Sequence, residues 1–453
     1  MFRADRFKGR HNLNFRISTG VTFLGGYLGA PSNFDNWLSD KISGWRSSLE
    51  ALAPAFAPHP QTAYTGLQKS LQQEWQYCQR VNPCPGDAFA PLEEVITTQL
   101  LPPLFGDQEP PPRDLTALPV KLSGLSLPRP TDTCTSNLEV SREVTKHLPQ
   151  SHLDPASPFN LQDHHDTVVQ ARSSCSIEAN TRHEIALQTL INACTLPPSG
   201  PDVAPEPDLP KQRLLQRAQL TGRFLTVYPS YSTDTALSAQ EFRDRLYYRY
   251  GLHPSDLPTQ CDGCNKPFSV DHAMSCKVGG LINARHDEIA HTLGSLYIEA
   301  TTPSSVSREP MIFPPPSTPT TPQPSADSNP GAPPPPPVVS QRPQDRGDLL
   351  LRGVYSPSTD CIIDVTIVDL NAKSYNTKLP EKVLRAKEPE KKRHYLKACQ
   401  QQRRHFAPFV ASTDGILGKE AHALLKTISR KLAPDKWQRP QSSVMSYIIA
   451  TIA

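Results

Sequence analysis

Four residues between positions 261 and 276 have the types and the spacing of a zinc site. Cys261 and Cys264 are separated by two residues, and His272 and Cys276 follow after a short loop. Thiolate sulfur and imidazole nitrogen are the ligands that structural zinc takes in a tetrahedral arrangement. Because protein ligands fill all four positions, no place is left for a catalytic water, so we expect a structural zinc ion. The alternative interpretation is a set of unrelated core cysteines.

Two aspartates form a second candidate site. Asp348 follows a glycine at the start of a strand expected at 347–355, and Asp364 lies inside an apolar strand expected at 360–370. A carboxylate inside a buried strand is costly unless something pairs with it. Two carboxylates on neighbouring strands can hold Mg²⁺, which then activates water. From these residues alone, it is an equally good interpretation that Asp348 is a turn residue and that Asp364 is a solvated strand end.

Two basic helices are candidates for contact with phosphate. The first is expected to begin at a Ser238–Glu241 capping box and to end at Gly251. The second covers 380–404, where basic residues outnumber acidic ones, and a break is expected at Pro389. Such an excess suits a nucleic-acid backbone, whereas a solvated helix face is the other common origin of a charge run. The candidate contacts are Arg243, Arg245, Arg249, Lys387, Lys392, Arg393 and Lys397.

The elements that must position these residues are predicted from hydrophobic periodicity. The N-terminal part is expected to be a small helical bundle after a strand pair, with a third helix that stops before Pro102, and with weak helices from 136 to 225. The part after the cysteine cluster is expected to be an α/β core. Its expected elements are a helix at 285–300, strands at 306–313, 347–355 and 360–370, the basic helix, a strand at 406–413 and a helix at 419–433.

Composition bounds the remaining choices. The chain has 453 residues, enough for several domains, and its 49 prolines are about twice the usual share of roughly 5%. Residues 314–345 hold a PPP run and a PPPPP run and are expected to be a disordered or polyproline insertion. A net charge of +3 is too small to indicate nucleic-acid binding by itself, so any basic surface has to be confined to a part of the chain. We expect reduced cysteines, a nuclear or other intracellular location, and neither secretion nor a membrane span.

The motifs occur in a definite order along the chain. In that order they are Cys261, Cys264, His272, Cys276, Arg285, His286, Asp348, Asp364 and the stretch from Lys391 to Tyr395. This order resembles the C-terminal part of non-LTR retrotransposon reverse transcriptases that carry a zinc knuckle and a restriction-like endonuclease. Upstream, GVTFLGGYLG at 20–29 and LPVKLSGLSL at 118–127 are similar to segments that follow the polymerase palm in those proteins. The resemblance covers residues 16–437.

The resemblance implies a PD-(D/E)XK nuclease domain. Asp348 and Asp364 would hold magnesium. The lysine usual two positions after the second acid is replaced here by Thr366, so that Lys391 on the following helix would orient water or stabilise charge. Tyr395 would lie beside it, and Lys387 is the second choice for this lysine.

The implied fold class is multidomain α+β. The implied domains are a remnant of the palm–thumb junction (1–30), a helical thumb-like region (31–135), a poorly defined helical or linker region (136–236), a basic helix with a CCHC zinc knuckle (237–280), a restriction-like endonuclease domain (281–437) and a C-terminal tail (438–453).

The sequence also departs from the family pattern. Ser123 and Ser126 replace glycines in the LPVKLSGLSL phrase, Gly347 replaces a proline, and His394 replaces a lysine. Reverse transcriptases need an Asp-Asp pair in the palm, and this sequence has none. We therefore expect no polymerase activity from this chain.

The function implied by the resemblance is that of a retrotransposon-derived fragment. Its C-terminal domain would nick target DNA with Mg²⁺ for target-primed reverse transcription. DNA, the element RNA and other proteins of the element are the implied partners. The alternative is a catalytically dead remnant that still binds nucleic acid, and a blander one is a decayed product without a stable fold.

Overall fold

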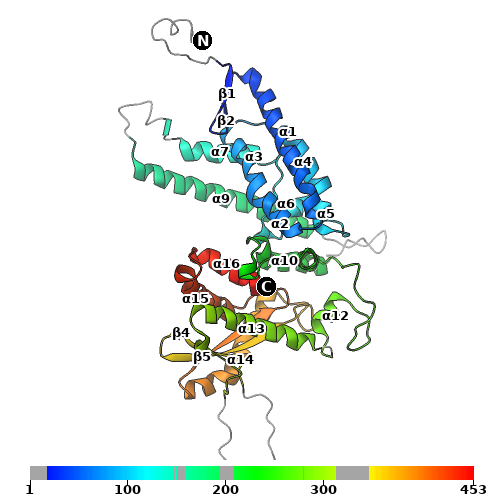
Figure 1. Cartoon of the computed structure of the whole chain (residues 1–453), viewed down its shortest axis with the longest axis vertical. Helices are drawn as coiled ribbons and strands as arrows, with labels where there is room; N and C mark the ends of the chain where they lie inside the picture. Colours follow the sequence, from blue (N-terminus) through cyan, green and yellow to red (C-terminus); the bar gives the residue numbers. More distant parts are fainter. Residues whose placement is uncertain are drawn as a thin grey trace, which may run out of the picture. The chain divides into compact units, whose positions relative to one another are not determined.

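The computed structural model describes residues 18–146, 148–149, 159–193, 209–278, 280–312 and 346–452. They fall into two units. The first contains the described residues up to Ser232 together with Ala236–Ser255, and the second contains Thr233–Thr235 and the described residues from Asp256 onward (Figure 1). The proline-rich insertion expected at 314–345 lies outside the described residues. Among the residues described, no helix combines the length and the apolar composition needed to cross a bilayer.

The first unit is a helical bundle that follows a β-hairpin. In the hairpin, β1 (Gly20–Phe23) pairs antiparallel with β2 (Gly26–Gly29), so of a strand pair or a tight turn alone, the two structures that the sequence allows here, the strand pair is observed. The first helix is buried along one face, at Leu38, Ile42, Trp45 and Leu49. The helices are α1 (Phe34–Leu52), α2 (Pro60–Gly66), α3 (Gln72–Val81), α4 (Ala90–Val95), α5 (Leu101–Phe105), α6 (Arg113–Ala117), α7 (Cys134–Thr145), α9 (Leu161–Asn192), α10 (Leu209–Leu220) and α11 (Ala239–Tyr250).

Two expectations for this unit are wrong. The third helix does not stop before Pro102, because a π-helical segment at Ile96–Leu100 leads into α5 and the prolines fall in its first turn. Proline is tolerated there, since its missing N–H would have no helical acceptor. In addition, α11 belongs to the first unit and is not grouped with the cysteine cluster. Its predicted capping box and its C-terminal Gly251 are both present.

The LPVKLSGLSL phrase has a left-handed backbone at both of its serines. The φ angles are 72° at Ser123 and 52° at Ser126. Their hydroxyls compensate for the strain, because Ser123 Oγ donates to the Leu215 carbonyl at 2.7 Å and Ser126 Oγ accepts from the Val120 N–H at 3.0 Å. Between them, a Cβ on Gly124 would lie 1.9 Å from the Leu118 carbonyl oxygen, so only glycine fits.

The second unit contains one four-stranded sheet in the order β3-β4-β5-β6. The pairs β3–β4 and β4–β5 are antiparallel, and β5–β6 is parallel with α14 as its crossover. The predicted order of helices and strands is therefore observed. The elements are α12 (Val270–Ser275), α13 (Leu281–Ala300), β3 (Val306–Arg308), β4 (Leu349–Ser356), β5 (Thr359–Val368), α14 (Pro380–Gln401), β6 (His405–Ser412), α15 (Lys419–Asp435) and α16 (Gln441–Ile452).

Apolar residues fill both faces of this sheet. On one face, residues of β4, β5 and β6 share a core with α13, α15 and α16. On the other face, Ile362 and Phe406 pack against Ala398 and Cys399 of α14. Coverage on both sides explains why β5 and β6 read as continuous apolar runs in the sequence.

Two further expectations for this unit are corrected. Pro389 does not break the basic helix, which runs unbroken as α14 with Pro389 inside it. Residues 438–453 are not a tail, because α16 buries Val444, Ile448 and Ile449 in the same core as the sheet.

We expect Gly124→Ala to destabilise the first unit by at least about 2 kcal/mol, because the added methyl group overlaps a carbonyl held by neighbouring structure. Urea denaturation of the full chain followed by circular dichroism measures the change. Ser126→Gly is the matched control: it removes backbone strain and one hydrogen bond together, so its free energy of unfolding should change by less than about 1 kcal/mol. An unchanged midpoint for Gly124→Ala would contradict the geometry of this turn.

Candidate functional site

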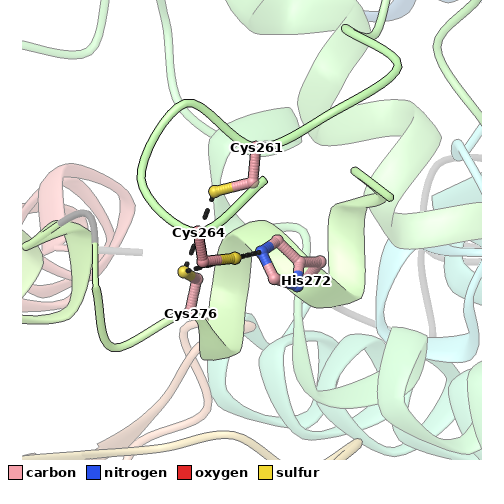
Figure 2. A group of neighbouring side chains, drawn as sticks. All are labelled: Cys261, Cys264, His272 and Cys276. Carbon is pink, nitrogen blue, oxygen red and sulfur yellow. Dashed lines mark hydrogen bonds between the residues drawn. The ribbon is translucent and has the colours of Figure 1, made fainter. Parts of the chain in front are cut away.

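The four cysteine and histidine ligands predicted from the sequence converge in the second unit. Their ligand atoms all lie within 4.8 Å of one another (Figure 2). Cys276 Sγ is 3.8 Å from the sulfur atoms of both Cys261 and Cys264, and Cys264 Sγ is 3.2 Å from His272 Nε2. With zinc–sulfur bonds of about 2.3 Å, two sulfurs at tetrahedral corners stand about 3.8 Å apart. The cluster therefore fits a tetrahedral metal ion such as zinc.

Local backbone structure places these ligands. A tight turn links the first two cysteines, in which the Asn265 N–H donates to the Cys261 carbonyl at 2.8 Å. Asn265 has a φ of 57°, a left-handed conformation that asparagine tolerates better than most residues. Ser269 then caps α12 by accepting the His272 N–H at 3.1 Å, which fixes the position of the histidine.

The cysteine cluster is tied to the sheet domain by two side chains. Arg285 of α13 donates to the Met274 carbonyl at 3.3 Å, in α12 between the last two ligands. Asn371, after β5, donates to Asp271 Oδ1 at 2.9 Å. The cluster thus helps to hold the start of α13, the helix that also carries His286.

The two predicted aspartates lie together on the sheet. In the antiparallel register of β4 and β5, Leu349 stands opposite Ile363, so continuing it by one residue puts Asp348 opposite Asp364. Asp364 is buried, at 6% exposed, and is therefore not a solvated strand end. Asp348 Oδ2 accepts the Val365 N–H at 2.6 Å, so the Asp348 side chain binds the backbone of β5.

Each aspartate has a cationic partner from a helix. Lys391 of α14 places its Nζ atom 2.9 Å from Asp364 Oδ2, and His286 of α13 places Nε2 3.3 Å from Asp348 Oδ2. Thr366, two positions after Asp364, donates to Asp364 Oδ2 at 3.3 Å. The lysine predicted on the helix is therefore within reach of the second acid.

Burial and charge shift two pKa values at this site. Burial raises the pKa of Asp364, while Lys391 opposes that shift. The hydrogen bond with Asp348 raises the pKa of His286 to about 9, against the lowering effect of burial. His286 therefore carries a positive charge at neutral pH, and the site contains two carboxylates and two cations.

Tyr395 lies beside Lys391, as expected. The Lys391 ammonium is 5.9 Å from the centre of the Tyr395 ring, close enough for a cation–π contact. Lys387, by contrast, forms an ion pair with Glu390 at 2.9 Å on its own helix. Of the lysines on α14, Lys391 is thus the one aligned with Asp364.

The buried carboxylate of Glu388 anchors α14 in the position that brings Lys391 to Asp364. Glu388 is 6% exposed, and its Oε1 accepts the Glu420 N–H at 2.8 Å in the first turn of α15. Lys392 adds an ion pair to Glu420 at 2.7 Å. A Cβ on Gly418 would lie 2.5 Å from Glu388 Oε1, so a side chain there would have to displace the carboxylate that joins the two helices.

The predicted nucleic-acid contacts divide into internal and exposed groups. Arg249 is buried and donates to the carbonyls of Val120 and Ala218, so it is not available to phosphate. Arg243 donates to the carbonyls of Ala57 and Pro103. Arg245 lies 5.8 Å from the Phe224 ring.

On α14, Lys387 and Lys392 are engaged in the ion pairs described above. Arg393 and Lys397 are exposed.

Two residues with clear structural roles were missed as site residues. His286 stood in the motif only as a member of an Arg-His pair, and its place on a helix before two acidic strands was the available signal. Glu388 had no distinctive signal, because its partner Glu420 is far away in sequence and the contact is to a backbone N–H.

Comparison of the chain with models of protein families, and with curated proteins, found no match.

We expect the purified chain to contain one zinc ion, and Cys264→Ser to lose it because a hydroxyl is a poor zinc ligand. Metal analysis by mass spectrometry measures the content. Cys175→Ser, at a partly exposed cysteine of α9, is the matched control and should keep the ion. Equal zinc in both variants would place the metal elsewhere.

The stability of the chain in magnesium-free buffer should depend on His286. Its pKa is raised from 6.5 to about 9 on folding, so its contribution is fully present below about pH 6.5 and is lost as pH rises through about 9. Urea denaturation across this window should show a steeper loss of stability for the wild type than for His286→Gln. His422→Gln, on the exposed side of α15, should follow the wild type. Parallel curves for all three proteins would mean that the His286–Asp348 pair does not form.

Proposed function

We propose that the second unit is a metal-dependent endonuclease that nicks DNA, within a chain derived from a non-LTR retrotransposon. One observation carries the proposal. Asp348 before β4, Asp364 on β5 and Lys391 on α14 come together, although they are spread over the sequence and over three elements. Two acids and a lysine in this order are what the resemblance implies for a restriction-like nuclease. The observed order of helices and strands supports the same class.

The donor set suits magnesium. Asp348 and Asp364 offer carboxylate oxygens, the ligands that Mg²⁺ prefers, and the imidazole beside them, that of His286, is paired with Asp348 Oδ2. A bound magnesium ion would supply activation of water and stabilisation of the leaving oxygen. Asp364 is buried next to Lys391, so the two carboxylates and the ammonium are held on rigid elements before any substrate arrives.

The other residues have positioning roles. His286 and the Val365 N–H both bind Asp348 Oδ2, and together they fix the direction of that carboxylate. Lys391 brings a positive charge to the acids, where it orients the attacking water or stabilises negative charge on phosphate. Tyr395 limits the directions that the Lys391 ammonium can take.

The proposed biological context follows from the resemblance. The nick would provide a 3′ hydroxyl for target-primed reverse transcription by a polymerase, which this chain does not supply. Target DNA and element RNA would be the partners, in the nucleus.

The catalytic proposal is tested by nicking of supercoiled plasmid by the full chain with Mg²⁺. Asp364→Asn keeps the shape of the side chain and removes its charge, so we expect nicking to fall to background. Lys391→Gln should lower the rate by about 100-fold or more, as loss of a charge-stabilising group does. Asp360→Asn, on the same strand but outside the site, is the control and should nick like the wild type.

A catalytically dead, nucleic-acid-binding remnant is the second candidate function. A specific observation favours it: both carboxylates already have cationic partners within the chain, in Lys391 and His286. The pair is thus neutralised without a metal ion. DNA binding by the wild type, with plasmid nicking no faster than that of Asp364→Asn, would establish this function and exclude the nuclease.

A further inference from the structure

Cys78 and Cys84 form a pair of thiols in contact inside the first unit. Cys78 lies in the last turn of α3, and Cys84 lies in the loop that follows this helix. Both cysteines are free, and their sulfur atoms are 3.9 Å apart. A disulfide bond needs the two sulfurs at about 2.05 Å, so a relative shift of about 2 Å between them would close it.

The backbone holds Cys84 next to the end of the helix. Pro83 and Pro85 flank this residue, and each proline ring fixes its own φ angle. The Cys84 N–H donates to the Asn82 carbonyl at 2.9 Å, in a tight turn directly after α3. The nearness of the two sulfurs is therefore a consequence of this turn.

The surroundings of the pair favour the thiolate form of Cys78. A hydrogen bond with Cys84 lowers the pKa of Cys78 against the raising effect of burial. The Asn82 side chain, whose Nδ2 donates to Cys78 Sγ at 3.5 Å, and the Lys41 charge lower this pKa further. The hydrogen bond between the two sulfurs raises the pKa of Cys84. Because the thiolate is the nucleophile, Cys78 is the member of the pair that attacks.

A cavity gives small molecules access to Cys78, although the side chain itself is buried. The cavity has a volume of about 380 Å³, and Cys78 lines it together with Trp37, Lys41 and Tyr77. One water molecule takes about 30 Å³ of liquid volume, so the cavity has room for an oxidant as small as hydrogen peroxide. Cys84 is partly exposed.

Two hydrogen bonds tie the β-hairpin to the same end of α3. Tyr77, next to Cys78, donates its hydroxyl to the Leu24 carbonyl at 2.6 Å. Asn82, between the two cysteines in sequence, accepts the Tyr27 N–H through Oδ1 at 2.9 Å. A bond between the two sulfurs would close a ring that contains Asn82, so it would restrict the local opening that frees the hairpin.

We propose that Cys78 and Cys84 are a site of reversible oxidation by hydrogen peroxide, and that their disulfide locks the β-hairpin onto α3. The Cys78 thiolate attacks one oxygen of the peroxide. The O–O bond breaks, the other oxygen leaves and is protonated to water, and a sulfenic acid remains on Cys78. The sulfur of Cys84 then attacks the sulfenic sulfur, the S–O bond breaks, and the thiol proton leaves with that oxygen as a second water. Two thiols are oxidised to one disulfide while one peroxide is reduced to two waters, and a dithiol reductant reverses the change by exchange.

Peptide mapping of the full chain after peroxide treatment tests the proposal. Trypsin cleaves after Lys69, Arg80 and Arg113, so it puts the two cysteines into separate peptides, 70–80 and 81–113. After brief exposure to hydrogen peroxide and alkylation of the remaining thiols, we expect these two peptides to be joined, and dithiothreitol to separate them. The link should form at least about threefold faster in the folded chain than in urea, because only the fold lowers the pKa of Cys78.

Two variants assign the roles of the two cysteines. Cys84→Ser leaves the attacking sulfur without a partner, so dimedone should label Cys78 as its sulfenic acid. Cys78→Ser should abolish both the label and the link. Cys134→Ser, which removes a third thiol close enough to act on the pKa of Cys84, is the matched control and should form the link at the wild-type rate. Wild-type peptides that stay separate, a link that forms no faster in the folded chain than in urea, or a link from Cys84 to Cys134 in its place overturns the proposal.

Hydrogen–deuterium exchange measures the effect on the hairpin. Residues 20–29 should exchange at least about threefold more slowly in the oxidised wild type than in the reduced wild type, because the closed ring restricts opening around Asn82. Cys84→Ser should show no such slowing after the same peroxide treatment. If the link forms and exchange in the hairpin stays the same, the locking of the hairpin is overturned.

Discussion

The chemistry of the second unit depends on the antiparallel register of β4 and β5. In this register Leu349 opposes Ile363, which brings Asp348 and Asp364 side by side at the start of β4. A slip of one residue would turn Asp364 to the opposite face, into the apolar core shared with α13 and α15, and away from Lys391. The alternation of apolar contacts on β5 resists this slip, because Ile362 and Ile363 pack into different cores on the two faces. The site is thus held by the same packing that stabilises the sheet.

The helices around the sheet supply the remaining constraints through contacts distant in sequence. Glu388 joins α14 to the first turn of α15, where the helix dipole favours a negative charge. Arg285 and His286 are neighbours on α13, yet one binds α12, the helix that carries His272, and the other binds Asp348. A metal ion in the cluster would therefore stabilise the end of the helix that carries His286, so a structural metal and the carboxylate pair share one element.

Local patterns predicted much of this fold, and nonlocal contacts account for the errors. The strands at β4, β5 and β6 and the helices α13 and α15 were predictable, because their apolar periods and lengths are strong. The cysteine cluster was predictable from ligand spacing alone. The helix break predicted at Pro389 is wrong. A proline lowers local helix propensity, but the tertiary contacts of Glu388 and Lys392 on either side of it override that preference. The phosphate contact predicted for Arg249 fails for the same reason. Its charge indicated a contact with phosphate, whereas its partners are buried carbonyl groups of segments distant in sequence. The convergence of Lys391 on Asp364 was suggested by the resemblance, and no local rule of spacing gave it.

The burial of α16 has a practical consequence for anyone who divides this chain into fragments. Its residues Val444, Ile448 and Ile449 complete the core beneath the sheet, next to α15. A fragment designed to end near residue 437, where the family resemblance ends, would leave that apolar surface open to water. Its aggregation would then be mistaken for decay of the gene product, although the cause would be the choice of boundary.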